Sequence, residues 1–261
     1  MNRIQQLFKQ QQRDILNIYC TAGYPQLEDT KRVILSLDQA GADIIELGMP
    51  YSDPLADGPT IQASSSVALD NGMSIKVLFQ QLENIRQESQ LPIILMGYLN
   101  PVLQYGMEAF LKQCQAVGVD GLILPDLPLY EYEKDYQALF EHYGLSMIFL
   151  ITPQTSEKRI RKIDSLSNAF IYIVSTAATT GKQTGFGAEN IAYFEKIQAM
   201  QLKNPTLIGF GISKAADYQT VCQYANGAIV GSAFIRMLEQ GQELESSIHQ
   251  FVKELKEPVT I

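Results

Sequence analysis

Short apolar runs typical of β-strands recur along the chain, and several are separated by segments whose apolar positions repeat with helical spacing. The eight runs lie at 15–22, 42–49, 92–98, 121–128, 146–152, 170–176, 206–212 and 227–233. The clearest helical segments lie at 31–40, 78–87, 107–116 and 188–200. Alternating strands and helices predict a parallel sheet, and continuous apolar runs predict strands that are covered on both faces.

Eight strand and helix units in 261 residues favour a closed (β/α)8 TIM barrel, although periodicity alone leaves a doubly wound sheet open. No Gly/Ser-rich linker, low-complexity tract or internal repeat divides the sequence, so we expect residues 1–261 to form a single barrel domain. Near the start, Ile4, Leu7 and Phe8 fall on one face of a short helix. We expect that helix to cap the bottom of the barrel.

Composition narrows the classes of function. Apolar residues make up 46% of the chain and charged residues 18%, as in globular proteins, and the net charge of -8 argues against a nucleic-acid surface. We find no signal-peptide core and no apolar stretch long enough to span a membrane. Three distant cysteines, Cys20, Cys114 and Cys222, signal neither a disulfide framework nor a zinc site, so we expect a cytoplasmic protein.

One carboxylate interrupts the second run, "ADIIELGM". Side chains alternate along a strand, so Glu46 shares a face with Ile44 and points either into the barrel or toward the helices. If it points inward, desolvation raises its pKa, which suits a general acid that can also return as a base. The alternative is a structural glutamate that is satisfied by a hydrogen bond to a neighbouring loop.

The loop after this run, "MPYSDPLADGPT", holds two more carboxylates between three prolines. Asp-Pro and Asp-Gly pairs are common in ordinary turns, but a loop this stiff is unusual for a mere connection. Composition does not distinguish Asp53 from Asp57, and either is a candidate partner for Glu46 in acid/base chemistry.

Glycine-rich junctions follow the last two runs, in "LIGFGIS" and "IVGSAF". Accessible backbone N–H groups and a helix N-terminus bind phosphate without net positive charge, and these two loops are the usual phosphate position in such barrels. Close helix packing at tight turns is the alternative. The segment 175–190 is small, polar and glycine-rich, which fits either a lid over a ligand or a surface loop.

A phosphate-binding barrel with acids at its mouth suggests carbon–carbon bond chemistry on a sugar phosphate, but the residues that the known aldolase mechanisms need are absent from the predicted strand ends. The lysines fall in helical or loop segments, with Lys182 and Lys214 nearest the mouth, which argues against a Schiff base. The only histidines, His142 and His249, fall in helical segments, which argues against a metal centre. What remains is acid/base catalysis by carboxylates on a substrate that supplies its own electron sink.

The stretch "IELGMPYSDPLADGPTIQ" is similar to the signature of the tryptophan synthase alpha chain family, and the resemblance continues in "TAGYP", "VGVDGLILPDLP", "GFGIS" and "GSAF". It covers essentially the full length. The resemblance implies a lyase that splits indole-3-glycerol phosphate into indole and glyceraldehyde 3-phosphate, with the indole ring as the electron sink. It implies no metal and no cofactor in this chain.

The resemblance also implies roles for particular residues. Glu46 would protonate the indole ring and help to deprotonate the side-chain hydroxyl, Asp57 would contact the indole N–H, and Tyr172 would assist near the glutamate. The residues implied to bind the rest of the substrate are Gly181, Gly211, Gly231 and Ser232 for phosphate, with Gly209 and Ser213 nearby, Tyr19, Met96, Tyr98, Ile123 and Phe210 for indole, and Thr180 in the lid. For each aromatic residue, a place in the barrel core is the alternative.

Family members work as αββα assemblies that pass indole to a beta chain containing pyridoxal phosphate, and the loop of Asp53 and Pro54 would contact that partner. Two loops depart from the commoner pattern, with Tyr24 in place of an aspartate, and Thr176 and Ala178 in place of arginine and glycine. These departures concern lid closure and coupling to the partner. A lyase that works without a partner, or a silent barrel that binds the ligand and activates its partner, are the competing hypotheses.

Overall fold

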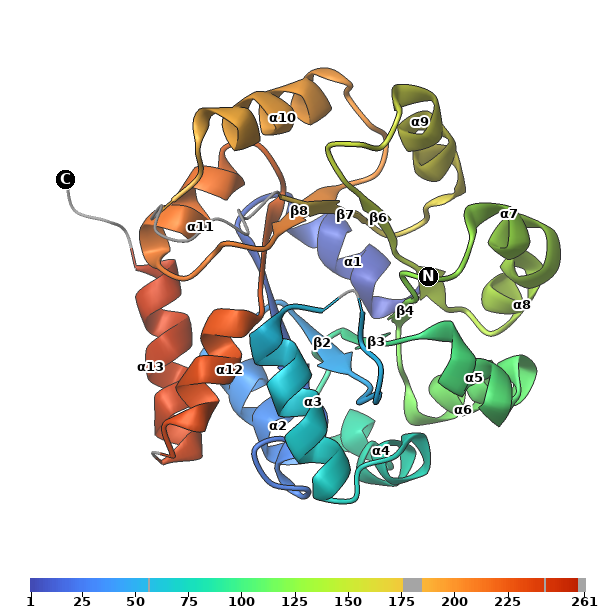
Figure 1. The fold of residues 1–261 in the computed structure, drawn as a ribbon, viewed down its shortest axis with the longest axis vertical. Helices are drawn as coiled ribbons and strands as arrows, with labels where there is room; N and C mark the ends of the chain where they lie inside the picture. The colour runs from blue at the N-terminus through green and yellow to red at the C-terminus, as the bar shows by residue number, and fades with distance from the viewer. Residues whose placement is uncertain (56, 176–184, 242, 258–261) are drawn as a thin grey trace.

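The computed structural model describes residues 1–55, 57–175, 185–241 and 243–257. Its strands form one parallel sheet that curls into a barrel, seen end on with the helices around it in Figure 1. The strands are β1 Ile15–Thr21, β2 Ile44–Gly48, β3 Ile93–Met96, β4 Gly121–Ile123, β5 Ser146–Met147, β6 Phe149–Ile151, β7 Ile171–Val174, β8 Thr206–Gly209 and β9 Gly227–Val230.

All eight predicted strands are present, and the order of the sheet decides between the two topologies. The fifth predicted strand is interrupted at Ile148 into β5 and β6, which pair with β4 and β7 respectively. The first strand pairs with both β2 and β9, so the sheet runs once around in chain order. This is the (β/α)8 TIM barrel, and the doubly wound alternative is wrong because that fold leaves two free edges.

Helices surround the barrel, with α1 at one end of its interior and the others outside. They are α1 Arg3–Gln10, α2 Asp29–Ala40, α3 Pro59–Asp70, α4 Ile75–Gln81, α5 Leu99–Tyr105, α6 Met107–Val117, α7 Leu129–Glu131, α8 Gln137–His142, α9 Glu157–Leu166, α10 Ala188–Ala199, α11 Ala215–Cys222, α12 Ser232–Glu239 and α13 Leu244–Lys256, with a short 3-10 helix η1 Ile85–Gln87 and a short π-helix η2 Tyr132–Tyr136. None of the helices in the described residues is long and apolar enough to cross a bilayer.

Three of the four predicted helical segments lie on α2, α6 and α10 with nearly the expected bounds. The segment predicted at 78–87 is wrong as one helix, because α4 ends at Gln81 and the chain continues into η1. Between them Asn84 has a left-handed backbone with φ of 61°, which an α-helix does not accommodate. An apolar repeat of helical period does not reveal such a break.

Two apolar clusters separate the inside of the barrel from its helical coat. The inner cluster takes alternate residues from the strands, including Ile15, Ile44, Ile94 and Ile229, together with Ile4 and Phe8 of α1. Leu7 is partly buried against the same cluster. The predicted capping helix is therefore confirmed, because α1 closes one end of the barrel interior with the apolar face expected from the sequence.

Polar contacts fix α1 at that end. Asn2 caps the helix by accepting from the N–H of Gln5, and its amide donates to Ser146 Oγ at 2.8 Å. Asp120, which is almost fully buried just before β4, accepts from Arg3 Nη1 at 3.1 Å and from Arg86 Nη2 at 3.0 Å. It also accepts from the N–H of Ile93 at 3.0 Å. The buried charge is thus paired on both carboxylate oxygens.

Candidate active site

Glu46 points into the barrel, which decides the question that the sequence left open. Its strand neighbour at the same face, Ile44, belongs to the inner cluster, whereas Ile45 and Leu47 pack against the helices. The Glu46 side chain is fully buried, and Asn17 Nδ2 on the adjacent strand β1 donates to its Oε1 at 2.5 Å. Among the described residues, Glu46 Oε2 has no hydrogen-bond partner.

A buried carboxyl group with one unpartnered oxygen favours its neutral form. Burial raises the pKa of Glu46 to about 8, and the hydrogen bond from Asn17 acts in the opposite direction because it stabilises the carboxylate. Both protonation states are therefore accessible near neutral pH. This is the property expected of a group that donates a proton in one step and accepts one in the next.

Two phenols lie beside this carboxyl group. Tyr19 on β1 and Tyr172 on β7 are both nearly buried, and burial raises the pKa of each, with further increases from Glu46 and Asp57. Both phenols thus stay protonated and act as hydrogen-bond donors at neutral pH.

Two glycines make room for these phenols. A Cβ at Gly48 would lie 2.1 Å from the Tyr19 hydroxyl, and a Cβ at Gly209 would lie 2.4 Å from that of Tyr172. Side chains at these strand ends would displace the rings from the barrel mouth.

Asp57 lies at the mouth, in the loop between β2 and α3. Tyr98 Oη donates to Asp57 Oδ2 at 3.1 Å, and burial raises the pKa of this carboxyl group while the Tyr98 hydrogen bond lowers it. The other aspartate of the loop, Asp53, is exposed, and Ser52 Oγ donates to it at 2.5 Å. The geometry thus separates two carboxylates that composition could not.

A small pocket joins Asp57 to three of the residues predicted to hold the indole ring. It is lined by Tyr19, Met49, Tyr51, Pro54, Asp57, Ser65, Met96, Gly97, Tyr98 and Pro125. The ring of Tyr51 packs against that of Tyr98 with centroids 5.2 Å apart, and Asn100 Nδ2 donates to Tyr51 Oη at 3.4 Å. The lining thus combines aromatic and methionine side chains with one carboxylate, which are groups that can contact a flat aromatic ring and its N–H group.

The other two predicted indole residues lie outside that pocket. Ile123 is fully buried in the inner cluster. Phe210 is 37% exposed after β8, and its ring centroid lies 6.3 Å from that of Tyr172. Contact of these two side chains with indole stays a prediction.

The predicted phosphate loops form one side of the mouth. Gly231 precedes the first turn of α12, which starts at Ser232, so the N–H groups of that turn have no partner within the helix. Gly211, after β8, has φ of 77°, a backbone conformation that favours glycine.

Ser213 donates through both its N–H and its hydroxyl to Asp217 Oδ2 at 3.1 Å. These two donors are therefore bonded to Asp217 of helix α11. Thr180, Gly181, Thr176 and Ala178 lie outside the described residues, whereas Tyr24 is described and buried.

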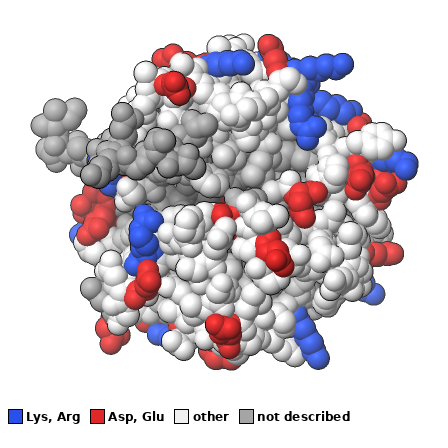
Figure 2. Space-filling view, in the orientation of Figure 1, with Lys and Arg blue, Asp and Glu red and all other residues white. Residues whose placement is uncertain are grey.

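The charge distribution agrees with backbone recognition of phosphate. At the centre of the face in Figure 2, the described residues show carboxylates, whereas the visible Lys and Arg side chains lie toward the rim. Within the described residues, no three His, Cys, Asp or Glu side chains gather closely enough to hold a metal ion. His142 and His249 lie on α8 and α13, as expected.

Some strand-end polar groups serve the fold rather than a ligand. Asp126 follows β4, and both of its carboxylate oxygens accept from the N–H of Leu99 at the start of α5. Ser175 Oγ donates to the carbonyl groups of Gly209 and Phe210, which ties the end of β7 to the loop after β8. Position at a strand end is therefore not sufficient to mark a site residue.

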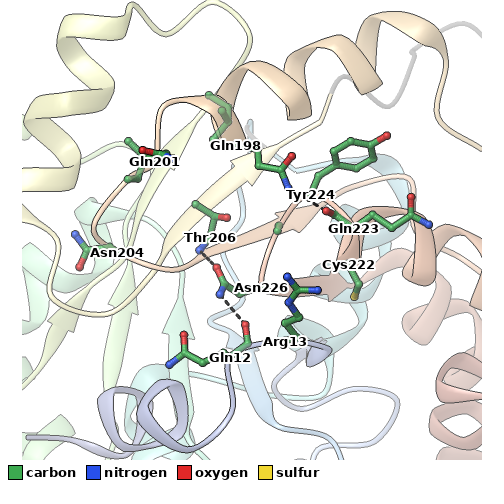
Figure 3. A pocket seen from close by; sticks show the side chains of 13 residues that line it. Gln12, Arg13, Gln198, Gln201, Asn204, Thr206, Cys222, Gln223, Tyr224 and Asn226 are labelled. Atoms are coloured by element: carbon green, nitrogen blue, oxygen red, sulfur yellow. Dashed lines mark hydrogen bonds between the residues drawn. The ribbon is translucent and has the colours of Figure 1, made fainter.

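A second cleft lies at the other end of the strands, near the starts of β8 and β9 (Figure 3). Its lining is rich in amides that are already bonded. Asn226 accepts from the N–H of Thr206 at 2.8 Å and donates to the carbonyl of Gln12 at 2.7 Å. The lining contains no Asp, Glu or His, so this cleft lacks the acid/base groups found at the mouth.

Sequence reasoning missed two contributors to the mouth. Asn17 could have been identified from the sequence, because it is a single amide side chain within the apolar run "ILNIYCTA" and shares a strand face with Ile15 and Tyr19. Tyr51 gave no comparable signal, because a tyrosine in a loop is common.

Comparisons with known proteins point in the same direction as this geometry. A sequence model of the tryptophan synthase alpha chain family matches residues 5–260. A relative called tryptophan synthase alpha chain in Flavobacterium johnsoniae is 55% identical over 256 residues, which cover 98% of this chain and 100% of the relative. The protein of the same name in Bacteroides thetaiotaomicron is 50% identical over 256 residues, with 98% and 100% covered.

Solved structures of tryptophan synthase also resemble this chain in fold. Tryptophan synthase subunit alpha from Legionella pneumophila superposes with a TM-score of 0.88 at 32% identity, covering 98% of this chain and 97% of that one. A chain of tryptophan synthase from M. tuberculosis, in an aminoacrylate-bound form, superposes with a TM-score of 0.84 at 31% identity, and 98% of each chain is covered.

Proposed function

Because this chain belongs to the tryptophan synthase alpha chain family, we propose that Glu46 and Asp57 carry out that family's cleavage of indole-3-glycerol phosphate. The chain is a carbon–carbon lyase that yields indole and glyceraldehyde 3-phosphate. It requires no cofactor of its own, since pyridoxal phosphate belongs to the beta chain. The observation that carries the residue assignment is the burial of Glu46 inside the barrel, where no described residue forms a hydrogen bond with its Oε2.

In the proposed mechanism, protonated Glu46 donates its proton to the indole carbon that bears the glycerol side chain. The ring becomes an indolenine with positive charge at nitrogen. The resulting Glu46 carboxylate takes the proton of the side-chain hydroxyl, and the carbon–carbon bond breaks. Its electron pair returns to the ring, the hydroxyl becomes the aldehyde, and Glu46 is protonated again. One proton enters the substrate and one leaves, so no co-reactant is required.

Asp57 is proposed to accept a hydrogen bond from the indole N–H. Its carboxylate would stabilise the positive charge that develops on the ring nitrogen after protonation. The Tyr98 hydroxyl, at 3.1 Å from Asp57 Oδ2, supports this role because it holds the carboxylate at the barrel mouth. The pocket residues Tyr19 and Met96 would pack against the ring.

Tyr172 is proposed to assist Glu46. Its phenol lies across the barrel interior from β2, and its raised pKa keeps it a neutral donor beside a carboxyl group that changes charge during the reaction. A neutral donor stabilises the carboxylate form without competing for the transferred proton.

The phosphate group is proposed to lie against the first turn of α12, with Ser232 and the glycines Gly181, Gly211 and Gly231 around it. The N–H groups of that turn and the partial positive charge of the helix N-terminus support this position. The scarcity of Lys and Arg at the centre of the described mouth surface agrees with recognition through the backbone.

This chain works with a beta chain, as its family does in the αββα tryptophan synthase. We propose that the loop from Tyr51 to Asp57 contacts that partner. Leu55 is 92% exposed and Asp53 is exposed beside it, so the loop presents an apolar side chain together with a charge at the mouth. Large exposed apolar side chains of this kind are buried at protein interfaces.

We further propose that the chain acts as one domain in the cytoplasm. Cys20, Cys114 and Cys222 are all free thiols, as is usual in a reducing compartment. Fractionation of the source cells, with the enzyme activity as the marker, tests the location.

Indole release from indole-3-glycerol phosphate, measured with and without the beta chain, tests the proposal. Glu46→Gln keeps the size of the side chain but removes the transferable proton, so we expect a loss of at least about 100-fold. Glu245→Gln, the same change at an exposed residue paired with Arg32, is the control. Full activity of Glu46→Gln would refute the assignment.

A further inference from the structure

We propose that Asn17 is a positioning residue for this reaction, which reserves one oxygen of Glu46 as an acceptor and directs the transferred proton to the other. The inference rests on the proposed role of Glu46. It adds a residue on the neighbouring strand that has no direct part in the chemistry, and it assigns different tasks to the two oxygens of the carboxyl group.

The contact is built into the barrel wall. In the paired strands, Asn17 on β1 lies opposite Ile44, and Tyr19 lies opposite Glu46 on β2. Asn17 and Glu46 therefore point inward from adjacent strands as diagonal neighbours, offset by two residues. Both are fully buried. Asn17 Nδ2 donates to Glu46 Oε1 at 2.5 Å, whereas Glu46 Oε2 and Asn17 Oδ1 have no hydrogen-bond partner within the described part of the chain.

An amide N–H can donate a hydrogen bond to a carboxyl group in either of its protonation states. Nδ2 donates to Oε1 when Glu46 is a carboxylate, and it also donates, more weakly, to the carbonyl oxygen of a neutral carboxylic acid. A proton on Oε1 would face this N–H group, so the proton is held on Oε2. The oxygen without a partner is therefore the one that exchanges a proton with the substrate.

The hydrogen bond also balances the effect of burial. It stabilises the carboxylate more than the acid, because hydrogen bonds to charged groups are stronger than those to neutral ones. Without it, burial alone would hold Glu46 as a tightly protonated acid that gives up its proton slowly.

The other titratable groups that face Glu46 do not stabilise its carboxylate in place of the Asn17 hydrogen bond. Tyr19 on β1 and Tyr172 on β7 are phenols whose pKa values are raised, mainly by burial, so they remain neutral. Asp57, in the loop after β2, is a like charge when ionised. Asn17 is the described side chain that donates to the carboxyl group.

The test is the pH profile of kcat/KM for indole release. Glu46 must start protonated, so the activity of the wild type should fall as the pH rises through about 8. In Asn17→Leu the amide donor is gone, so this alkaline limb should move up by about one to two pH units. The plateau should fall by roughly tenfold, because a weaker acid protonates the ring more slowly.

Asn17→Asp serves as a second variant of nearly the same shape. At high pH the carboxylate of the new aspartate cannot donate a hydrogen bond and repels the charge of ionised Glu46. The alkaline limb of the pH profile should therefore move to higher pH by at least as much as in Asn17→Leu. This variant keeps the test decisive if Asn17→Leu does not fold. The matched control is Asn226→Leu, which removes a bonded amide at the opposite end of the strands and should leave the limb in place even if stability falls.

The outcomes separate the two proposals. An inactive Glu46→Gln together with a shifted limb in both Asn17 variants supports both. An inactive Glu46→Gln with an unshifted limb in the folded Asn17 variants overturns the inference about Asn17 alone. An active Glu46→Gln overturns the proposed role of Glu46, and the role of Asn17 with it.

Discussion

Tyr98 donates a hydrogen bond to Asp57 across the barrel mouth, with 3.1 Å between Oη and Oδ2. The bond joins the loop after β2 to the residue that follows β3 and precedes α5. It holds the Asp57 carboxylate in the wall of the pocket that Tyr19, Met96 and Tyr98 also line.

Asp57→Asn should lower kcat for indole release by about 100-fold, because an amide does not stabilise the positive charge on the indole ring as a carboxylate does. The matched control is Asp53→Asn in the same loop, which should leave cleavage by the isolated chain close to that of the wild type. Steady-state kinetics of the two variants, side by side, measure the difference. Equal losses in both would mean that the loop, and not the charge of Asp57, matters.

Tyr98→Phe should cause a smaller loss, of about three- to tenfold, since only one neutral hydrogen bond is removed. The bond lowers the pKa of Asp57, so its loss should move the acidic limb of the activity profile to higher pH. Activity measured between pH 5 and pH 8 would reveal this shift. An acidic limb that stays in place would separate Tyr98 from the ionisation of Asp57.

Ionisation of Glu46 should reduce the stability of the folded chain at high pH. The pKa of this group is about 8 when folded and near 4.5 when exposed, so its neutral form is favoured by folding. This contribution to the free energy of unfolding is fully present below about pH 4.5. As the pH rises from about 4.5 to about 8 it decreases by up to about 1.4 kcal/mol per pH unit, and above about pH 8 no further decrease is expected.

Urea unfolding of the wild type and of Glu46→Gln at pH 5, 6.5, 8 and 9 measures this effect. The free energy of unfolding of the wild type should fall relative to that of the variant as the pH rises to about 8, with little further change at 9. Differences that are the same at all four pH values would contradict a shifted pKa, whatever the kinetics show.

Gly231→Asp should weaken the binding of glycerol phosphate by at least about tenfold, because it places a negative charge at the proposed phosphate site. The fold should tolerate the change. Gly231 has φ of -118°, a Cβ there would lie 3.4 Å from Tyr19 Cβ, and aspartate is a favourable residue before a helix. Gly231→Ala is the control for size, and isothermal titration of all three proteins gives the affinities.

Asp120→Ala should destabilise the chain by about 3 kcal/mol without a comparable change in the chemistry at the mouth. It leaves Arg86, a largely buried guanidinium whose pKa is lowered to about 10 by burial, without its carboxylate partner. Thermal melting and urea unfolding measure the loss. Glu245→Ala, which breaks an exposed ion pair with Arg32, should cost less than about 1 kcal/mol.

The strand pattern was predictable because each barrel strand is covered on both faces. A continuous apolar run such as that around Ile93 or Ile171 has few other places in a soluble fold, and α1 was visible as a narrow apolar face. The break at Asn84 was not predictable, since it depends on a backbone conformation that apolar spacing does not report.

The candidate site was predictable in part. Glu46 was conspicuous as a charge inside an apolar run, and resemblance to a family distinguished Asp57 from Asp53. The role of Asn17 was not predictable from its position in an apolar run, because its hydrogen-bond partner Glu46 is 29 residues away on the next strand. The value of an isolated amide in a strand depends on what another strand places opposite it.

Sequence alone therefore determined the alternation of strands and helices, the apolar face of α1 and the presence of a carboxyl group on β2. Only the tertiary structure decided that Glu46 faces inward, that Asn17 bonds one of its oxygens and leaves the other open, and that Tyr98 holds Asp57. The reason is physical. Side-chain alternation divides a strand into two faces, but when both faces are buried, only closure of the barrel determines which one becomes the interior.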